Sequence, residues 1–212
     1  MLTRRHIRLK IMQIIYALRI SDFEYTKETE KKLLESIDST YELYLILISF
    51  LIEILKKAQE KHLISQKKLL SDQNNIYDNK KFIKNQFLNL LKSNHLFNEE
   101  IKKRNLNLWH LDFKYVDLIY ENLIKSELFS DYIDNDEISY ENDRNFVAKF
   151  YKNIIVTNDK LYSYLEDRNI NWMDDFPLIN TIILKLINKS KGVNSKTYFL
   201  PKLYKDNQDK IF

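Results

Sequence analysis

The 212-residue sequence contains no cysteine, a single glycine and only two prolines. The lack of cysteine excludes disulfides, thiolate catalysis and zinc sites built on cysteine. A single glycine excludes the glycine-rich loops that cradle phosphates in P-loop and dinucleotide-binding proteins. Glycine and proline are also the residues on which β-hairpins and tight turns depend. Their scarcity therefore predicts an all-α protein.

Long apolar runs are scarce as well. The longest, residues 43–55, is shorter than the about 20 residues that cross a bilayer, and it contains Glu53. This run predicts a buried helix. The N-terminal charges are not followed by an uninterrupted apolar stretch, so we expect no signal peptide. The absence of cysteine is compatible with a reducing compartment, and we expect a cytoplasmic protein.

The composition that is present indicates a folded chain. Hydrophobic residues make up 44% and aromatic residues 13%, whereas disordered chains have few residues of either kind. The net charge of +4 is only mildly basic, so any affinity for nucleic acid must come from a local patch. The many Lys, Asn, Ile and Tyr residues are typical of an AT-rich genome. We therefore give more weight to the arginines than to scattered lysines.

Residues 3–20 form such a basic patch on a predicted helix. Arg4 and Arg8 lie one turn apart, beside Arg5 and Lys10. Cations at a helix N-terminus oppose the macrodipole, which indicates a use outside the helix. A basic face that is merely solvated is the alternative. The core-facing stripe of this helix is predicted to comprise Ile7, Ile11, Ile14, Ile15 and Leu18.

The rest of the chain predicts a helical bundle with a long central helix over residues 26–66. The apolar stripe of this helix indicates the seam of an antiparallel helical pair or coiled coil: Leu34, Ile37, Tyr41, Tyr44, Ile48, Leu51, Leu55 and Ala58. A loop or a frayed helix end is predicted over 67–79. Further helices are predicted over 80–93, 111–125, 140–156, 159–167 and 174–189, and the last is bracketed by Pro177 and Gly192.

An acidic stretch over 130–137 predicts a boundary between two regions, 1–130 and 138–212. The N-terminal region would hold the basic helix and the long helices. In the C-terminal region, an amphipathic pattern begins at Leu200 and stops almost at once. The last five residues also echo residues 142–146, which open the helix at 140. We therefore expect a truncated chain.

Nothing in the sequence proposes an active site. The four histidines are far apart and follow no metal-binding spacing, so we expect no metal, no cofactor and no enzyme activity. The pair Asp174-Asp175 is interpreted as a helix N-cap. Trp109 and Trp172 are expected to pack in the core.

Two patches resemble the NusB family of transcription antitermination factors. Arg4-Arg-x-x-Arg8 with Gln13 and Tyr16 is similar to the family's opening pattern, Arg-Arg-x-x-Arg-x-x-x-x-Gln-x-x-Tyr. Residues 143–155, Asn171-Trp172 and residues 179–185 are similar to its central helices. The long insertion between the patches resembles the extended form found in Bacteroidetes-type bacteria. The C-terminal helices of that form have no counterpart in this sequence, and Asn180 stands where the family has aspartate.

The resemblance implies an all-α factor that binds single-stranded boxA RNA of ribosomal transcripts with ribosomal protein S10. With S10 and the RNA polymerase complex, such a factor promotes reading through terminators. Arginine can bind phosphate and stack on bases, and tyrosine can stack on an unpaired base. The alternative is a non-catalytic helical scaffold, or a degenerate fragment, without RNA binding. By resemblance, the RNA-binding residues would be Arg4, Arg5 and Arg8, then Lys10, Gln13 and Tyr16.

Overall fold

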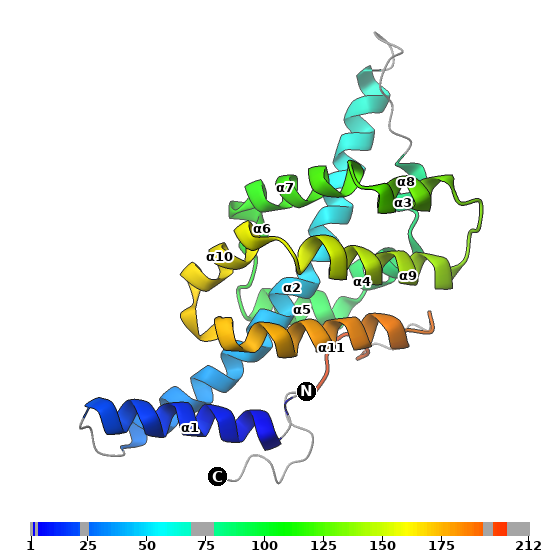
Figure 1. Ribbon diagram of the computed structural model, residues 1–212. Helices are drawn as coiled ribbons and strands as arrows, with labels where there is room; N and C mark the ends of the chain where they lie inside the picture. Colours follow the sequence, from blue (N-terminus) through cyan, green and yellow to red (C-terminus); the bar gives the residue numbers. More distant parts are fainter. Residues whose placement is uncertain (1, 3, 22–25, 69–78, 193–196, 203–212) are drawn as a thin grey trace.

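The computed structural model describes residues 2, 4–21, 26–68, 79–192 and 197–202. Within these residues the backbone is helical and contains no strand, which confirms the predicted all-α bundle with a long central helix (Figure 1). A π-helical turn (Tyr151–Ile155) follows α9, and a 3-10 helix (Ile170–Asp175) leads into α11. The α-helices are α1 (Arg4–Ser21), α2 (Lys27–Lys68), α3 (Lys80–Ile83), α4 (Gln86–Lys92), α5 (His95–Lys103), α6 (Leu108–Leu111), α7 (Phe113–Ile124), α8 (Glu127–Asp134), α9 (Tyr140–Phe150), α10 (Asp159–Arg168) and α11 (Phe176–Lys189).

Helix α2 runs through the whole molecule, and the other helices gather around it (Figure 1). Every residue from 43 to 55 except Glu53 is buried, as the longest apolar run predicts. Because α2 contacts α1, α3, α4, α6, α7 and α11, its middle is covered on all sides. The predicted two-helix seam is therefore wrong as a description of this helix. Its first member, Leu34, is 45% exposed.

Asparagine caps divide the chain into more helices than its periodicity predicts. The helix predicted over 80–93 is two helices, because Asn85 Oδ1 accepts the Leu88 N–H at 3.0 Å and starts α4 anew. Asn94 accepts the Phe97 N–H at 2.9 Å in the same way. This second cap begins α5, a helix that the sequence analysis did not predict.

The remaining predicted helices match the structure more closely. The helix predicted over 111–125 is α7, preceded by the short α6, and that over 140–156 is α9 continued by the π-helical turn. Gly192 lies just beyond α11 with a φ of 73°, a conformation that suits glycine. Residues 69–78, in the predicted loop, and 203–212, in the C-terminal amphipathic pattern, lie outside the described residues.

The predicted boundary over residues 130–137 falls at the end of α8, which continues to Asp134. The helix break was therefore predicted too early. Tyr132 of α8 stacks on Phe146 of α9 with ring centroids 3.8 Å apart. Core residues from both sides of this segment belong to one hydrophobic cluster. The division of the chain into two regions stays a prediction.

Both tryptophans are buried in the core, as predicted. The indole N–H of Trp109 donates to the Ile46 carbonyl at 3.0 Å. That of Trp172 donates to the Ser39 carbonyl at 3.0 Å and to the Ser39 hydroxyl at 2.7 Å. These bonds tie the two segments that carry the tryptophans to α2.

Candidate nucleic-acid interface

Helix α1 lies along the edge of the molecule and packs one side against α2 (Figure 1). Ile7 is buried with Ile37 of α2, and Leu178 of α11 packs against them. Ile15 was predicted to join this stripe, but it is 57% exposed. Ile15 points about 100° away from the half-buried Ile14, beyond the side of α1 that α2 covers. The prediction for Ile15 is therefore wrong.

The arginines of α1 lie at its surface. Arg4, Arg5 and Arg8 are all exposed on the first two turns, and α1 contains no Asp or Glu. Burial lowers the pKa of His6, and the nearby positive charge of Arg5 lowers it further. The N-terminal half of α1 is therefore a local centre of positive charge in a chain that is only mildly basic overall.

Tyr16 shares a helix face with two of these arginines. Positions 5, 8, 12, 16 and 19 follow steps of three and four, so their side chains lie in one row. Tyr16 is 67% exposed, which leaves its ring accessible. This row and its apolar neighbours point away from α2. We call the set the outward face of α1, and it consists of Arg5, Arg8, Leu9, Met12, Ile15, Tyr16, Arg19 and Ile20.

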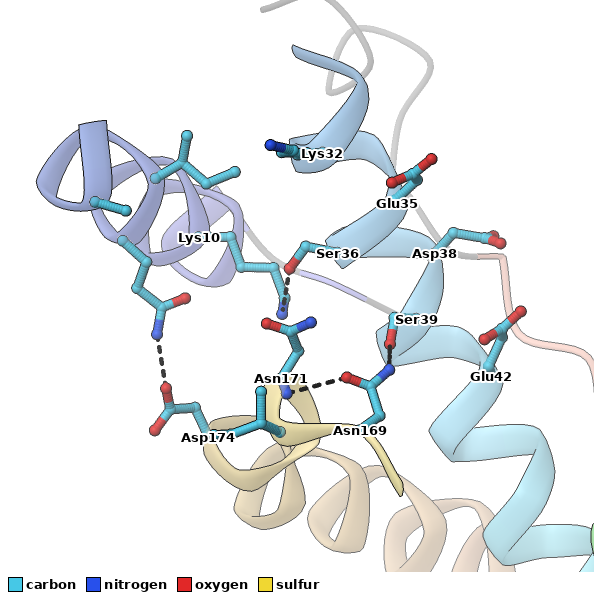
Figure 2. A pocket seen from close by; sticks show the side chains of 14 residues that line it. Lys10, Lys32, Glu35, Ser36, Asp38, Ser39, Glu42, Asn169, Asn171 and Asp174 are labelled. Atoms are coloured by element: carbon cyan, nitrogen blue, oxygen red, sulfur yellow. Dashed lines mark hydrogen bonds between the residues drawn. The ribbon is translucent and has the colours of Figure 1, made fainter. Parts of the chain in front are cut away.

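Lys10, which the resemblance assigns to RNA, lies on the inner side of α1. It is buried, and its ammonium donates to Asp175 Oδ2 at 2.9 Å. It also donates to the Ser36 hydroxyl at 3.2 Å (Figure 2). The Thr40 hydroxyl donates to the same Asp175 oxygen at 2.7 Å. A buried, paired ammonium holds α1 in place and is not presented to a ligand.

Gln13 is exposed, like the arginines, but it also bonds a neighbouring segment, like Lys10. Its side-chain amide donates to Asp174 Oδ2 at 2.7 Å, across 161 positions of sequence. This bond joins α1 to the 3-10 helix that precedes α11. Asp175 was interpreted as an N-cap together with Asp174, but it makes no side-chain capping bond to α11. It serves as the partner of Lys10 instead.

A groove of about 770 Å³ lies between α1, the first half of α2 and residues 169–174 (Figure 2). Four carboxylates line it, against two lysines: Glu35, Asp38, Glu42 and Asp174 against Lys10 and Lys32. Arg104 lies 2.7 Å from Asp38 and 3.9 Å from Glu42. Burial raises the pKa of Glu42, and the charge of Asp38 adds to this effect. Such a groove disfavours phosphate, which leaves the outward face of α1 as the candidate nucleic-acid interface.

Sequence reasoning missed the residues that fix α1. Ser36 and Thr40 belong to α2 and Asp175 to the segment before α11. Only in the folded chain do Ser36 and Asp175 meet Lys10 and does Thr40 meet Asp175. Helical periodicity reports which face of α2 Ser36 and Thr40 occupy, but it cannot name their partner. No local signal in the sequence identifies this pairing.

In the described part of the chain, the His, Asp and Glu side chains form no group of three or more that could hold a metal ion. None of its helices combines the length and the apolar character that a membrane crossing requires.

No protein-family model, curated protein or solved structure matches this chain. The resemblance to the NusB family therefore rests only on the sequence patches described above. What it implies about RNA and partner proteins is a matter for proposal.

Proposed function

We propose that the outward face of α1, together with Arg4 beside it, binds single-stranded RNA. In this proposal the protein acts as a transcription antitermination factor on boxA-type elements of ribosomal RNA transcripts, together with ribosomal protein S10 and RNA polymerase. One observation carries the RNA part: Arg4, Arg5 and Arg8 are exposed on a helix that has no acidic residue. The S10 and polymerase part rests on the resemblance alone.

The chemistry of this face suits a single strand. Arg5 and Arg8 can bind phosphates, and Tyr16 offers an exposed ring about 16 Å farther along the helix axis than Arg5. Stacking of unpaired bases on aromatic rings is the usual way in which single-stranded RNA is recognised. The cationic strip is one helix wide, and carboxylates of the groove border it on the Gln13 side. A wide duplex would meet these carboxylates.

Lys10 and Gln13 have a supporting role in this proposal. Lys10 fixes α1 against α2 and the 3-10 helix before α11 through its bonds to Ser36 and Asp175, and Gln13 ties α1 to Asp174. A helix held at several points keeps the arginines and Tyr16 in a constant arrangement, which lowers the entropic cost of binding. In this proposal, both residues position the RNA-binding helix and leave the RNA contacts to Arg4, Arg5, Arg8 and Tyr16.

The test is a titration of labelled boxA-type RNA by fluorescence anisotropy at several salt concentrations. Each phosphate contact to a single strand contributes about 0.7 to the slope of log K against log salt. We expect Arg5→Gln and Arg8→Gln each to lower the affinity and to reduce the slope by about that amount. Tyr16→Ala should lower the affinity while leaving the slope unchanged.

Arg168→Gln is the matched control, because it removes one exposed arginine from α10. It should leave both affinity and slope unchanged. If all three glutamine variants behave alike, general charge and not the outward face attracts RNA. If the unsubstituted protein does not bind the RNA, the alternative of a helical scaffold without RNA binding stands.

A further inference from the structure

The outward face of α1 exposes more apolar surface than RNA binding needs. Leu9, Met12, Ile15, Tyr16 and Ile20 are between 51% and 67% exposed. Single exposed apolar residues are common, but a contiguous row of large ones marks an interaction surface. Binding of RNA phosphates does not explain why four aliphatic side chains are exposed on this face.

We propose that this face docks an amphipathic helix of another protein, whose apolar row is flanked by carboxylates. This proposal is independent of RNA binding. The row at positions 9, 12, 16 and 20 advances by three or four residues at each step, which is the spacing of anchors between two packed helices. From Leu9 to Ile20 it extends about 16 Å, or three turns. A partner helix of three to four turns would cover it.

Charge complementarity identifies the partner as acidic. Arg5 and Arg8 lie at one end of the apolar row and Arg19 at the other, and no carboxylate on α1 neutralises them. Carboxylates near both ends of the partner's apolar row would meet these arginines. Complementary charges of this kind favour the correct partner and speed its association.

The same charges disfavour two other occupants. Pairing α1 with α1 of a second copy would bring arginines together with no acidic residue between them. A flat anionic membrane would approach the carboxylates of the neighbouring groove as well as the arginines. A single helix fits within the width of α1 and avoids both problems.

The test uses the full chain and a designed, labelled helical peptide of four turns. The peptide carries leucines at positions i, i+3, i+4 and i+7 with glutamates beside them, and a matched peptide carries lysines in place of the glutamates. We expect the glutamate peptide to bind at least about tenfold more tightly than the lysine peptide, because opposite charge is the recognition element. Equal affinities, or no binding of the glutamate peptide, would overturn the proposal.

Variants then locate the binding surface. Ile15→Gln with Ile20→Gln removes two exposed apolar side chains of the outward face and should weaken peptide binding by at least about tenfold. Ile138→Gln is the matched control, because Ile138 is 82% exposed between α8 and α9 and should not affect binding. Unchanged binding by the double variant would place the peptide elsewhere and refute the docking site.

Three further measurements separate the other occupants. If sedimentation shows that the unsubstituted protein self-associates and that the double variant does not, the occupant of this face would be a second copy of the chain. The acidic-helix proposal would then be overturned. If instead the protein binds vesicles containing anionic lipid but not the peptide, and the double variant loses vesicle binding, the face would be a membrane-binding surface. The double variant should still bind RNA through Arg5 and Arg8, so failure of the docking proposal and failure of the RNA proposal remain distinguishable.

Discussion

The Lys10 ammonium lies 2.9 Å from Asp175 Oδ2, although the two residues are 165 positions apart in the sequence. Both side chains are almost completely buried, at 6% and 9% exposure. Thr40 and Ser36 of α2 complete the hydrogen bonding of this pair. Three segments that are distant in sequence are therefore joined at one point beneath α1. A lysine that the sequence grouped with the surface arginines instead fixes the helix that carries them.

Removing the lysine should destabilise the protein strongly. Lys10→Met keeps much of the side-chain volume but leaves Asp175 buried without its counter-charge. Loss of one partner of a buried ion pair costs about 3–5 kcal/mol, and we expect an effect of this size on the free energy of unfolding in urea. Adding Asp175→Leu to Lys10→Met should recover part of the loss. A loss below about 1 kcal/mol for Lys10→Met would mean that the pair is not buried in solution.

The sequence could predict α1 as a helix but not the direction in which each cation points. Lys10 and Arg8 look alike in a charge pattern. In the structure they differ, because Lys10 is buried against Asp175 whereas Arg8 is exposed to solvent. The predicted core-facing stripe of α1 likewise includes one residue too many, Ile15. Periodicity identifies a face of a helix, and only packing shows how far around the helix the neighbours extend.

The predicted helix boundaries differ from the observed ones for another reason. Apolar periodicity continues through Asn85, so residues 80–93 predict one helix, whereas the amide of Asn85 caps a new one. The signal was present at Asn94 too, because an asparagine followed by an apolar pattern is a common helix start. Long and strongly periodic segments such as α2 and α11 were predicted well, since many residues agree on one face.

Asn180 should be important for stability. The hydroxyls of Tyr151 and Tyr162 both donate to its Oδ1, each at 2.8 Å. Asn180→Leu removes the acceptor of the fully buried Tyr151 hydroxyl and of the part-buried Tyr162 hydroxyl. An unsatisfied buried group costs about 1–3 kcal/mol, and we expect a loss of this size in the free energy of unfolding.

A double variant provides the control for Asn180. Tyr162→Phe removes one of the two hydroxyls, so it should recover part of the stability lost in Asn180→Leu. In the unsubstituted background, Tyr162→Phe should be neutral or destabilising. Strictly additive effects of the two substitutions would show that Tyr162 and Asn180 are not coupled.

Tyr162 also predicts a loss of stability at alkaline pH. Burial raises the pKa of Tyr162 to about 12, while an unfolded tyrosine has a pKa of about 10. Between these values the unfolded chain has released the proton and the folded chain still holds it. Stability should therefore be complete below about pH 10 and should fall as pH rises toward 12, by at most about 1.4 kcal/mol per pH unit from this residue. Urea unfolding of Tyr162→Phe across this range should show a shallower decline, and a decline parallel to that of the unsubstituted protein would contradict the assignment.

Gln13 distinguishes a positioning role from a direct contact with RNA. Its bond to Asp174 is exposed, so Gln13→Ala and Asp174→Ala should each change the free energy of unfolding by less than about 1 kcal/mol. If Gln13 only positions α1, Gln13→Ala should weaken RNA binding slightly in the unsubstituted protein and not at all in the Asp174→Ala background, where the bond is already broken. If Gln13→Ala weakens RNA binding equally in both backgrounds, the amide itself contacts RNA. Anisotropy titrations of the two single variants and the double variant give the answer, with Arg168→Gln as the control for altered surface polarity.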